Sequence, residues 1–213
     1  MPRENFIHVQ TWVFDLDHTL YSPETSLFDQ IEARMTDYVM RSLEIGFHEA
    51  NSLRARYWRE HGTTLAGLML NHGLEPEPYL EEVHDIDLSV LPLAPDLRSA
   101  IHALTGRKIV FTNGSRGHAR RVIAALGLDG IFHATYGIED AGYHPKPREV
   151  AFERVFGSDG FETRNAAMFE DDPRNLLVPH RLGMRTVLVG PGDPAPHIHH
   201  QTTDLTEFLG RIR

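Results

Sequence analysis

The chain has 213 residues, no cysteine and a formal net charge of -9 at pH 7, with 41% hydrophobic and 24% charged residues. The lack of cysteine excludes disulfides and thiolate nucleophiles. No apolar run approaches the roughly 18 residues that a membrane span needs. The negative net charge is the opposite of the basic surplus typical of nucleic-acid binders. The opening MPRENFIHV lacks the pattern of a secretory signal, so we expect a cytoplasmic protein.

The first predicted element is a short buried strand at residues 11–14, which is aromatic and β-branched and ends at Asp15. From residue 22 to 91 the pattern changes, and apolar residues recur at helical spacing. Further helices are predicted around 48–60, 63–72 and 77–84. We therefore predict a helical domain at 22–91, inserted into a core domain formed by 1–21 and 92–213.

Beyond Pro92 and Pro95 strands alternate with helices. Strands are predicted at 107–112, 131–136, 165–170 and 185–189, and helices at 96–104, 115–126, 147–156, 173–182 and 203–212. This alternation predicts an α/β fold with a doubly wound, mainly parallel, Rossmann-like sheet covered by helices on both faces. Ligands of such sheets bind beyond the carboxyl ends of the strands.

Polar residues follow four segments of this core. They are Asp15-Leu-Asp17, Thr112-Asn113-Gly114, Lys146 and Glu170-Asp171-Asp172. Because parallel strands end at one edge of the sheet, we expect these side chains to converge. Each has an alternative interpretation by itself: a turn, a capped helix start, a surface lysine, or the acidic first turn of a helix.

Two carboxylates at positions i and i+2 suit a two-step transfer of a phosphoryl group, first to a carboxylate and then to water. Asp15 can attack phosphorus and form an aspartyl-phosphate. Asp17 can protonate the leaving oxygen and then activate the water that hydrolyses the intermediate. Thr112, Asn113 and Lys146 are candidates for binding the phosphoryl oxygens.

We predict a magnesium ion as cofactor, because magnesium prefers oxygen ligands such as carboxylates. Asp15 and Asp171 supply carboxylates for it, and the main-chain carbonyl of Asp17 supplies a further oxygen. Such a cation offsets the repulsion between an anionic nucleophile and an anionic phosphate.

The order of these motifs resembles the haloacid dehalogenase superfamily, in the branch with a helical cap inserted after the first motif. Phe14-Asp-Leu-Asp-His-Thr-Leu20 matches its first motif and Phe111-Thr-Asn-Gly114 its second, while Lys146 and Glu170-Asp171 match the third and fourth. The resemblance covers nearly the whole chain. It implies a phosphatase that uses magnesium, Asp15 and Asp17.

Finer features resemble the pyrimidine 5'-nucleotidase group. Examples are Asp17-His-Thr-Leu-Tyr21 and His61-Gly-Thr-Thr-Leu-Ala-Gly67. The resemblance implies a nucleoside 5'-monophosphate as substrate. Asp172 departs from the family pattern, which often has serine there. Spacing to the following Asn175 favours Asp171 as the direct metal ligand, with Glu170 acting through water or by orienting its neighbours.

Other functions remain open from the sequence. The substrate can instead be a sugar phosphate, phosphoglycolate or pyridoxal phosphate, and the chain can be a phosphomutase, a dehalogenase or a non-catalytic binding module. We expect a small phosphate ester as partner, neither a nucleic-acid polymer nor a membrane, and either a monomer or a homodimer. His197, His199 and His200 are predicted to lie in a solvated loop, and Arg54, Arg56 and Arg59 on a solvated helix face.

Overall fold

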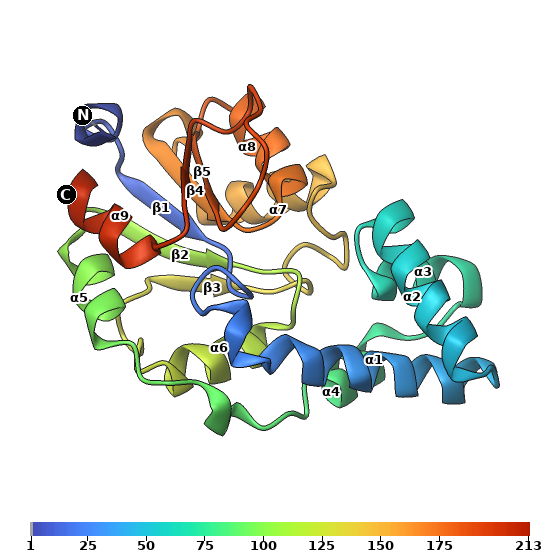
Figure 1. Ribbon diagram of the computed structural model, residues 1–213. Helices are drawn as coiled ribbons and strands as arrows, with labels where there is room; N and C mark the ends of the chain where they lie inside the picture. The colour runs from blue at the N-terminus through green and yellow to red at the C-terminus, as the bar shows by residue number, and fades with distance from the viewer. Residues whose placement is uncertain (1) are drawn as a thin grey trace.

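A six-stranded parallel sheet forms the centre of the protein (Figure 1). The structure is a computed structural model and describes residues 2–213. The sheet order is β3-β2-β1-β4-β5-β6. The strands are β1 (Thr11–Phe14), β2 (Arg107–Phe111), β3 (Ala134–Tyr136), β4 (Ala166–Glu170), β5 (Arg185–Val189) and β6 (His200–Thr202). The predicted fold class, an α/β core with a helical insertion after the first strand, is confirmed.

Nine α-helices accompany the sheet within the described part of the chain. They are α1 (Leu27–Leu43), α2 (Phe47–His61), α3 (Thr64–His72), α4 (Pro76–Val83), α5 (Pro95–Ala103), α6 (Arg116–Ala125), α7 (Glu149–Asp159), α8 (Leu177–Arg181) and α9 (Leu205–Ile212). None of the helices in residues 2–213 has the length and apolar character needed to cross a bilayer.

Two apolar layers hold helices against the two faces of the sheet. Successive strand residues point to opposite faces, and β1 shows this directly. Trp12 and Phe14 pack with residues of α5, α6 and α9, whereas Val13 packs with residues of α7 and α8. Both layers are fully buried, which is why the strands are apolar runs rather than alternating ones.

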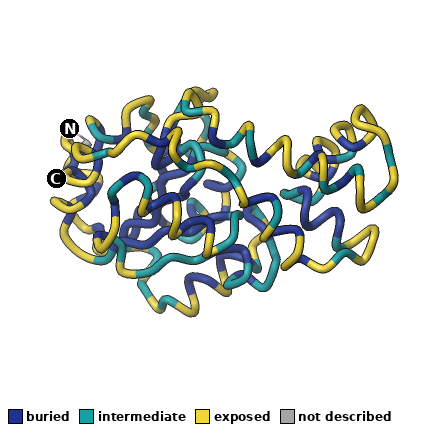
Figure 2. The backbone as a smooth tube through the Cα atoms, turned by 90° about the horizontal axis from the view of Figure 1, so that it is seen from below, coloured by how far each residue is buried: buried dark blue, intermediate teal, exposed yellow. Residues whose placement is uncertain are grey.

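Helices α1 to α4 form a lobe beside the sheet, reached through the segment that follows β1 (Figures 1 and 2). The lobe has its own apolar cluster, which includes Val39, Leu68 and Leu80. Gly67 of α3 allows a close helix contact, because a Cβ there would lie 2.2 Å from the Tyr57 ring of α2. This lobe corresponds to the predicted cap, and the domain limits at residues 21/22 and 91/92 stay a prediction.

Two predictions about the last third of the chain were wrong. The segment around His200 is the edge strand β6 and not a loop, since Gly190 donates to Thr202 at 2.7 Å. The helix predicted at 173–182 is divided into a 3-10 turn, Pro173–Leu176, and α8. Pro179 accounts for the division, because it lacks the N–H that would bond the carbonyl of Asn175.

Candidate active site

The predicted site residues meet at the carboxyl edge of the sheet. β1 lies between β2 and β4, so Asp15, Thr112 and Asp171 follow three adjacent strands. The chain turns to opposite sides after β1 and β4, which makes this the switch point where doubly wound sheets bind ligands. A cavity of about 710 Å³ opens there. The predicted residues that line it are Asp15, Asp17, Thr112, Asn113, Lys146, Glu170, Asp171 and Asp172.

Lys146 is the buried hub of the site. Its ammonium group donates to Asp15 Oδ1 at 2.7 Å, to Glu170 Oε1 at 2.6 Å and to the Phe111 carbonyl at 2.9 Å. Burial alone would lower the pKa of Lys146, but the Asp15 and Glu170 carboxylates raise it. All three ammonium hydrogens are therefore used, and the lysine is a fixed cation next to Asp15.

Asp15 begins the loop after β1, and its main-chain N–H donates to the Phe169 carbonyl of β4 at 2.9 Å. This bond extends the sheet by one residue and fixes where the carboxylate leaves it. Burial raises the pKa of Asp15; the Lys146 cation opposes the rise, while the Asp171 and Asp17 carboxylates add to it. The environment thus disfavours an ionised Asp15 until more positive charge arrives.

The surroundings of Asp17 favour its ionised form, in contrast. The Tyr21 hydroxyl donates to its Oδ1 at 2.6 Å, and the His118 Nε2 lies 3.3 Å from the same oxygen. Burial alone would raise the pKa of Asp17, but the His118 hydrogen bond and charge, together with the Tyr21 hydroxyl, lower it to about 2. Asp17 is therefore ready to accept a proton.

Thr112 and Asn113 differ in how free their side chains are. The Thr112 hydroxyl accepts a bond from the Gly114 N–H at 2.9 Å and keeps its own proton for a ligand. The Asn113 side chain is bonded at both ends to the main chain of Lys146, at 2.8 and 3.1 Å. Asn113 therefore positions the lysine segment, and only its main-chain N–H is left for an anion.

The three neighbouring acids after β4 have different surroundings. Glu170 is fully buried and accepts from Lys146, from the Asn175 amide at 2.7 Å and from the Asp172 N–H at 2.9 Å. Asp172 caps the next turn and pairs with the Arg174 guanidinium at 2.6 Å. Asp171 is the most exposed of the three acids, with its side chain 33% exposed, and the His18 ring lies 3.6 Å from its Oδ2.

Among the described residues, one group of acids could hold a metal ion. It comprises Asp15, Glu170 and Asp171, whose ligand oxygens lie within 4.8 Å of one another. The donor set is all oxygen, which suits a hard cation. His197, His199 and His200 are not in such a group, and His199 Nδ1 instead lies 2.7 Å from the Thr186 hydroxyl.

The helical lobe supplies the opposite wall of the cavity. Its apolar lining comes from Phe28, Ile31, Met35, Leu65, Tyr79, Leu80 and Val83. Arg54 was predicted to be solvated, and this was wrong: it is 7% exposed and lies 3.2 Å from Glu32 and 2.6 Å from Thr36. Arg174 of the core lies 3.8 Å from the Trp58 ring of the lobe, which joins the two parts at the cavity rim.

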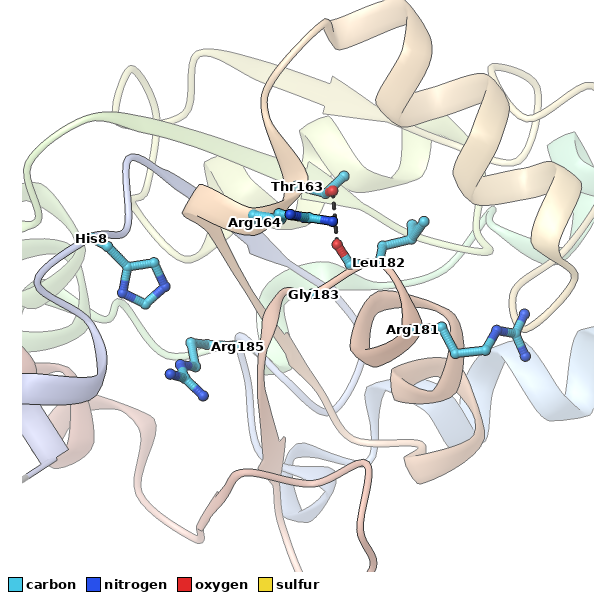
Figure 3. A pocket seen from close by; sticks show the side chains of 7 residues that line it. All are labelled: His8, Thr163, Arg164, Arg181, Leu182, Gly183 and Arg185. Carbon is cyan, nitrogen blue, oxygen red and sulfur yellow. Dashed lines mark hydrogen bonds between the residues drawn. The ribbon is translucent and has the colours of Figure 1, made fainter.

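A second cavity, of about 690 Å³, lies at the opposite edge of the sheet, where β4 and β5 begin. Its lining includes His8, Arg164 and Arg185 (Figure 3). The Thr163 hydroxyl donates to the Leu182 carbonyl at 2.9 Å and is not free to react. No carboxylate is among its lining residues in the described part of the chain, so the acids of the site belong to the main cavity.

Sequence reasoning missed several groups that contact the predicted residues. Tyr21 and His118 bind Asp17, Asn175 binds Glu170, and His84 stacks on His118. Tyr21 directly follows the first motif, so its proximity to Asp17 could have been inferred from the spacing of four residues. No local signal places His118 or His84 there, because each contact depends on the tertiary fold.

Comparisons with known proteins show the family of this chain. Residues 9–183 match the family model of haloacid dehalogenase-like hydrolases. Phosphate metabolism protein 8 of Saccharomyces cerevisiae is 26% identical over 196 residues, which are 84% of this chain and 61% of the yeast protein. The chain thus spans less than two thirds of the length of that relative.

Solved structures share the fold. A HAD phosphatase from Thermococcus onnurineus superposes with a TM-score of 0.63 at 18% identity, covering 96% of this chain and 98% of the other. The HAD hydrolase YfnB of Bacillus subtilis, solved with bound magnesium, gives 0.60 at 17% identity with the same coverage. Haloacid dehalogenases are also among the similar structures. The family match over most of the chain shows that this protein belongs to the haloacid dehalogenase-like hydrolases.

Proposed function

We propose that this hydrolase is a magnesium-dependent phosphatase that cleaves small phosphate monoesters through an aspartyl-phosphate on Asp15. One observation carries the proposal. Asp15 lies 2.7 Å from the buried cation of Lys146 and shares its cavity with Asp17, a second carboxylate that is suited to proton transfer. A phosphate ester needs both groups, one to attack phosphorus and one to handle the proton.

The acids of the site fit a magnesium ion. Glu170 has its oxygens occupied by protein donors, so Asp15 and Asp171 are the carboxylates that remain for direct coordination. The main-chain carbonyl of Asp17 is the third ligand that we propose. When bound, the ion supplies positive charge that ionises Asp15 and attracts phosphate. The magnesium bound in the structure of YfnB supports this choice of metal.

We assign each residue of the site a role in two chemical steps. An Asp15 oxygen attacks phosphorus, the bond to the leaving oxygen breaks, and Asp17 gives that oxygen a proton. Water attacks the aspartyl-phosphate while Asp17 takes its proton back. The Thr112 hydroxyl and the main-chain N–H of Asn113 bind the phosphoryl oxygens. The dianionic substrate raises the pKa of Asp17 by like-charge repulsion, so that Asp17 carries the proton that it donates in the first step.

We further propose a nucleoside 5'-monophosphate, in particular a pyrimidine one, as substrate. The main support is the resemblance of the first motif and the lobe to pyrimidine 5'-nucleotidases. The volume of about 710 Å³ and the apolar wall from the lobe suit a base and sugar. The name of the yeast relative, a phosphate metabolism protein, agrees with phosphate ester chemistry in general.

A panel of esters tests this proposal. Phosphate release is measured from pyrimidine and purine nucleotides, sugar phosphates, phosphoglycolate and pyridoxal phosphate, with magnesium and with a chelator. Pyrimidine nucleotides should rank first, and the chelator should abolish release. Nucleotides near the bottom of the ranking would contradict the substrate, and halide release from a 2-haloacid at full rate in chelator would contradict the chemistry.

A pair of neighbouring substitutions tests the metal ligand. Asp171→Asn should raise the magnesium concentration needed for half-maximal activity by roughly 10-fold or more, because it removes a direct carboxylate ligand. Asp172→Asn should change it little, since Asp172 is already paired with Arg174. The measurement is a magnesium titration of phosphate release. If Asp172→Asn has the larger effect, the ligand assignment is off by one residue.

A further inference from the structure

The Asp17 carboxylate is held on one of its two oxygens. Tyr21 and His118 both contact Oδ1, at 2.6 and 3.3 Å. In residues 2–213 no protein donor lies within hydrogen-bond distance of Oδ2, and Asp17 lines the main cavity. The two donors therefore leave Oδ2 free to meet a bound ester.

His118 has a single polar side-chain contact. The residue is 1% exposed, and its Nδ1 has no hydrogen-bond partner in the described part of the chain. Burying an unpartnered ring nitrogen costs stability that an apolar side chain of similar size would not cost. Since the Asp17 Oδ1 accepts whether or not Oδ2 carries a proton, the His118 Nε2 carries the proton of this hydrogen bond and donates it. Packing alone does not account for a histidine here, whereas its bond to Asp17 does.

The plane of the His118 ring is fixed by the lobe. His84, the C-cap residue that follows α4, stacks on it with ring centroids 4.3 Å apart and an interplanar angle of 13°. The Ser115 hydroxyl lies 3.1 Å from His84 Nδ1 and accepts the main-chain N–H of His118 at 3.1 Å. The end of the lobe and the start of α6 thus hold His118 in one orientation toward Asp17.

We propose that His118 is a positioning residue for Asp17: together with Tyr21 it fixes Oδ1, so that Oδ2 is the oxygen that transfers the proton. The inference rests on the proposed phosphatase function. In the first step the Asp15–phosphorus bond forms, the bond from phosphorus to the leaving oxygen breaks, and the proton of Oδ2 moves to that oxygen. In the second step water attacks phosphorus, its proton moves to Oδ2, and Asp15 is released as a carboxylate.

This role predicts a loss that depends on the leaving group. An alkoxide leaves slowly without a proton, whereas p-nitrophenolate needs little help from an acid. His118→Leu should therefore lower kcat/KM for an alkyl phosphate by about 30-fold or more and for p-nitrophenyl phosphate by less than about threefold. The alkyl probe is whichever of uridine 5'-monophosphate, ribose 5-phosphate or glycerol 3-phosphate the wild-type protein cleaves fastest.

Three further variants separate positioning from packing. His118→Gln keeps an N–H at the place of Nε2 and should restore most of the alkyl-ester activity. Tyr21→Phe removes the second donor while keeping the ring, and should show the same dependence on the leaving group. This variant keeps the test possible even if His118→Leu does not fold. Val122→Ala removes buried volume one turn further along α6, where Val122 is fully buried. It should lower the melting temperature without changing the ratio of the two kcat/KM values.

The outcomes are distinct. A wild-type protein that releases no phosphate from any ester contradicts the proposed function, and the inference with it. If the wild type is active and the His118→Leu and Tyr21→Phe variants lose activity equally toward both esters, or toward neither, the inference is overturned while the proposed function stands. Failure of His118→Gln to recover more activity than His118→Leu also overturns it.

Discussion

Asp15→Asn is expected to reduce phosphate release by on the order of 10⁴-fold or more, because the amide has no nucleophilic carboxylate with which to attack phosphorus. The fold should be kept. Lys146 retains Glu170 and the Phe111 carbonyl as partners, and asparagine has nearly the same shape as aspartate. Steady-state phosphate release with saturating magnesium, together with a thermal melt, measures both effects.

Asp129→Asn is the matched control for this change. Asp129 is an exposed acid after α6, and the same substitution there should leave activity at the wild-type level. Activity near the wild-type level in Asp15→Asn would remove the nucleophile from the mechanism. A variant that melts far below the wild type would show that the loss comes from unfolding instead.

Lys146→Met is expected to reduce both stability and activity. It leaves the buried Asp15 and Glu170 carboxylates facing each other without a cation, which costs about 3–5 kcal/mol in the free energy of unfolding. Activity should fall by roughly 10²–10³-fold, because a fixed positive charge at the reacting oxygens is lost. Denaturant titration in the presence of a chelator measures the stability without compensation by a metal.

The stability loss should depend on pH. Burial raises the pKa of Glu170 in the folded protein, and removal of Lys146 takes away the charge that opposes this. A carboxyl whose pKa is higher in the folded than in the unfolded state destabilises the fold as pH rises through that range. The deficit of Lys146→Met should therefore be larger at about pH 8 than at about pH 5.

Lys108→Met is the matched control on the neighbouring strand. Lys108 is also buried, and burial lowers its pKa, but its ammonium contacts only the Gly106 carbonyl, at 3.3 Å, among the described residues. Replacement by methionine should cost little or nothing, with little dependence on pH. Equal losses in the two variants would mean that the carboxylates around Lys146 do not determine its effect.

Much of the fold could be predicted because its strands are short apolar runs. Residues 12–14 are buried on both faces and therefore carry a strong local pattern. β6 was missed because His200–Thr202 is polar and lies at the edge, where pairing with β5 and not burial makes the strand. Arg54 was misjudged for a related reason, since only the contact with Glu32 and Thr36 explains its burial.

The site was predictable in its residue types and not in its contacts. Asp15 and Asp171 follow predicted strands, and the carboxyl ends of parallel strands share one edge of the sheet, which was enough to expect the two residues at the same site. The spacing did not reveal that Asn113 binds the main chain of Lys146, or that Asp172 binds Arg174. These contacts depend on where the tertiary fold places each side chain, and no periodic pattern in the sequence indicates them.

Trapping the covalent intermediate tests the central claim most directly. The wild-type protein is mixed with magnesium and a readily cleaved ester, quenched in acid during the first turnovers, digested and analysed by mass spectrometry. We predict one phosphoryl group on the peptide that contains Asp15, and none on that peptide in Asp15→Asn. Release of phosphate with the label on another residue, or with no labelled peptide in any quench, would contradict Asp15 as the nucleophile.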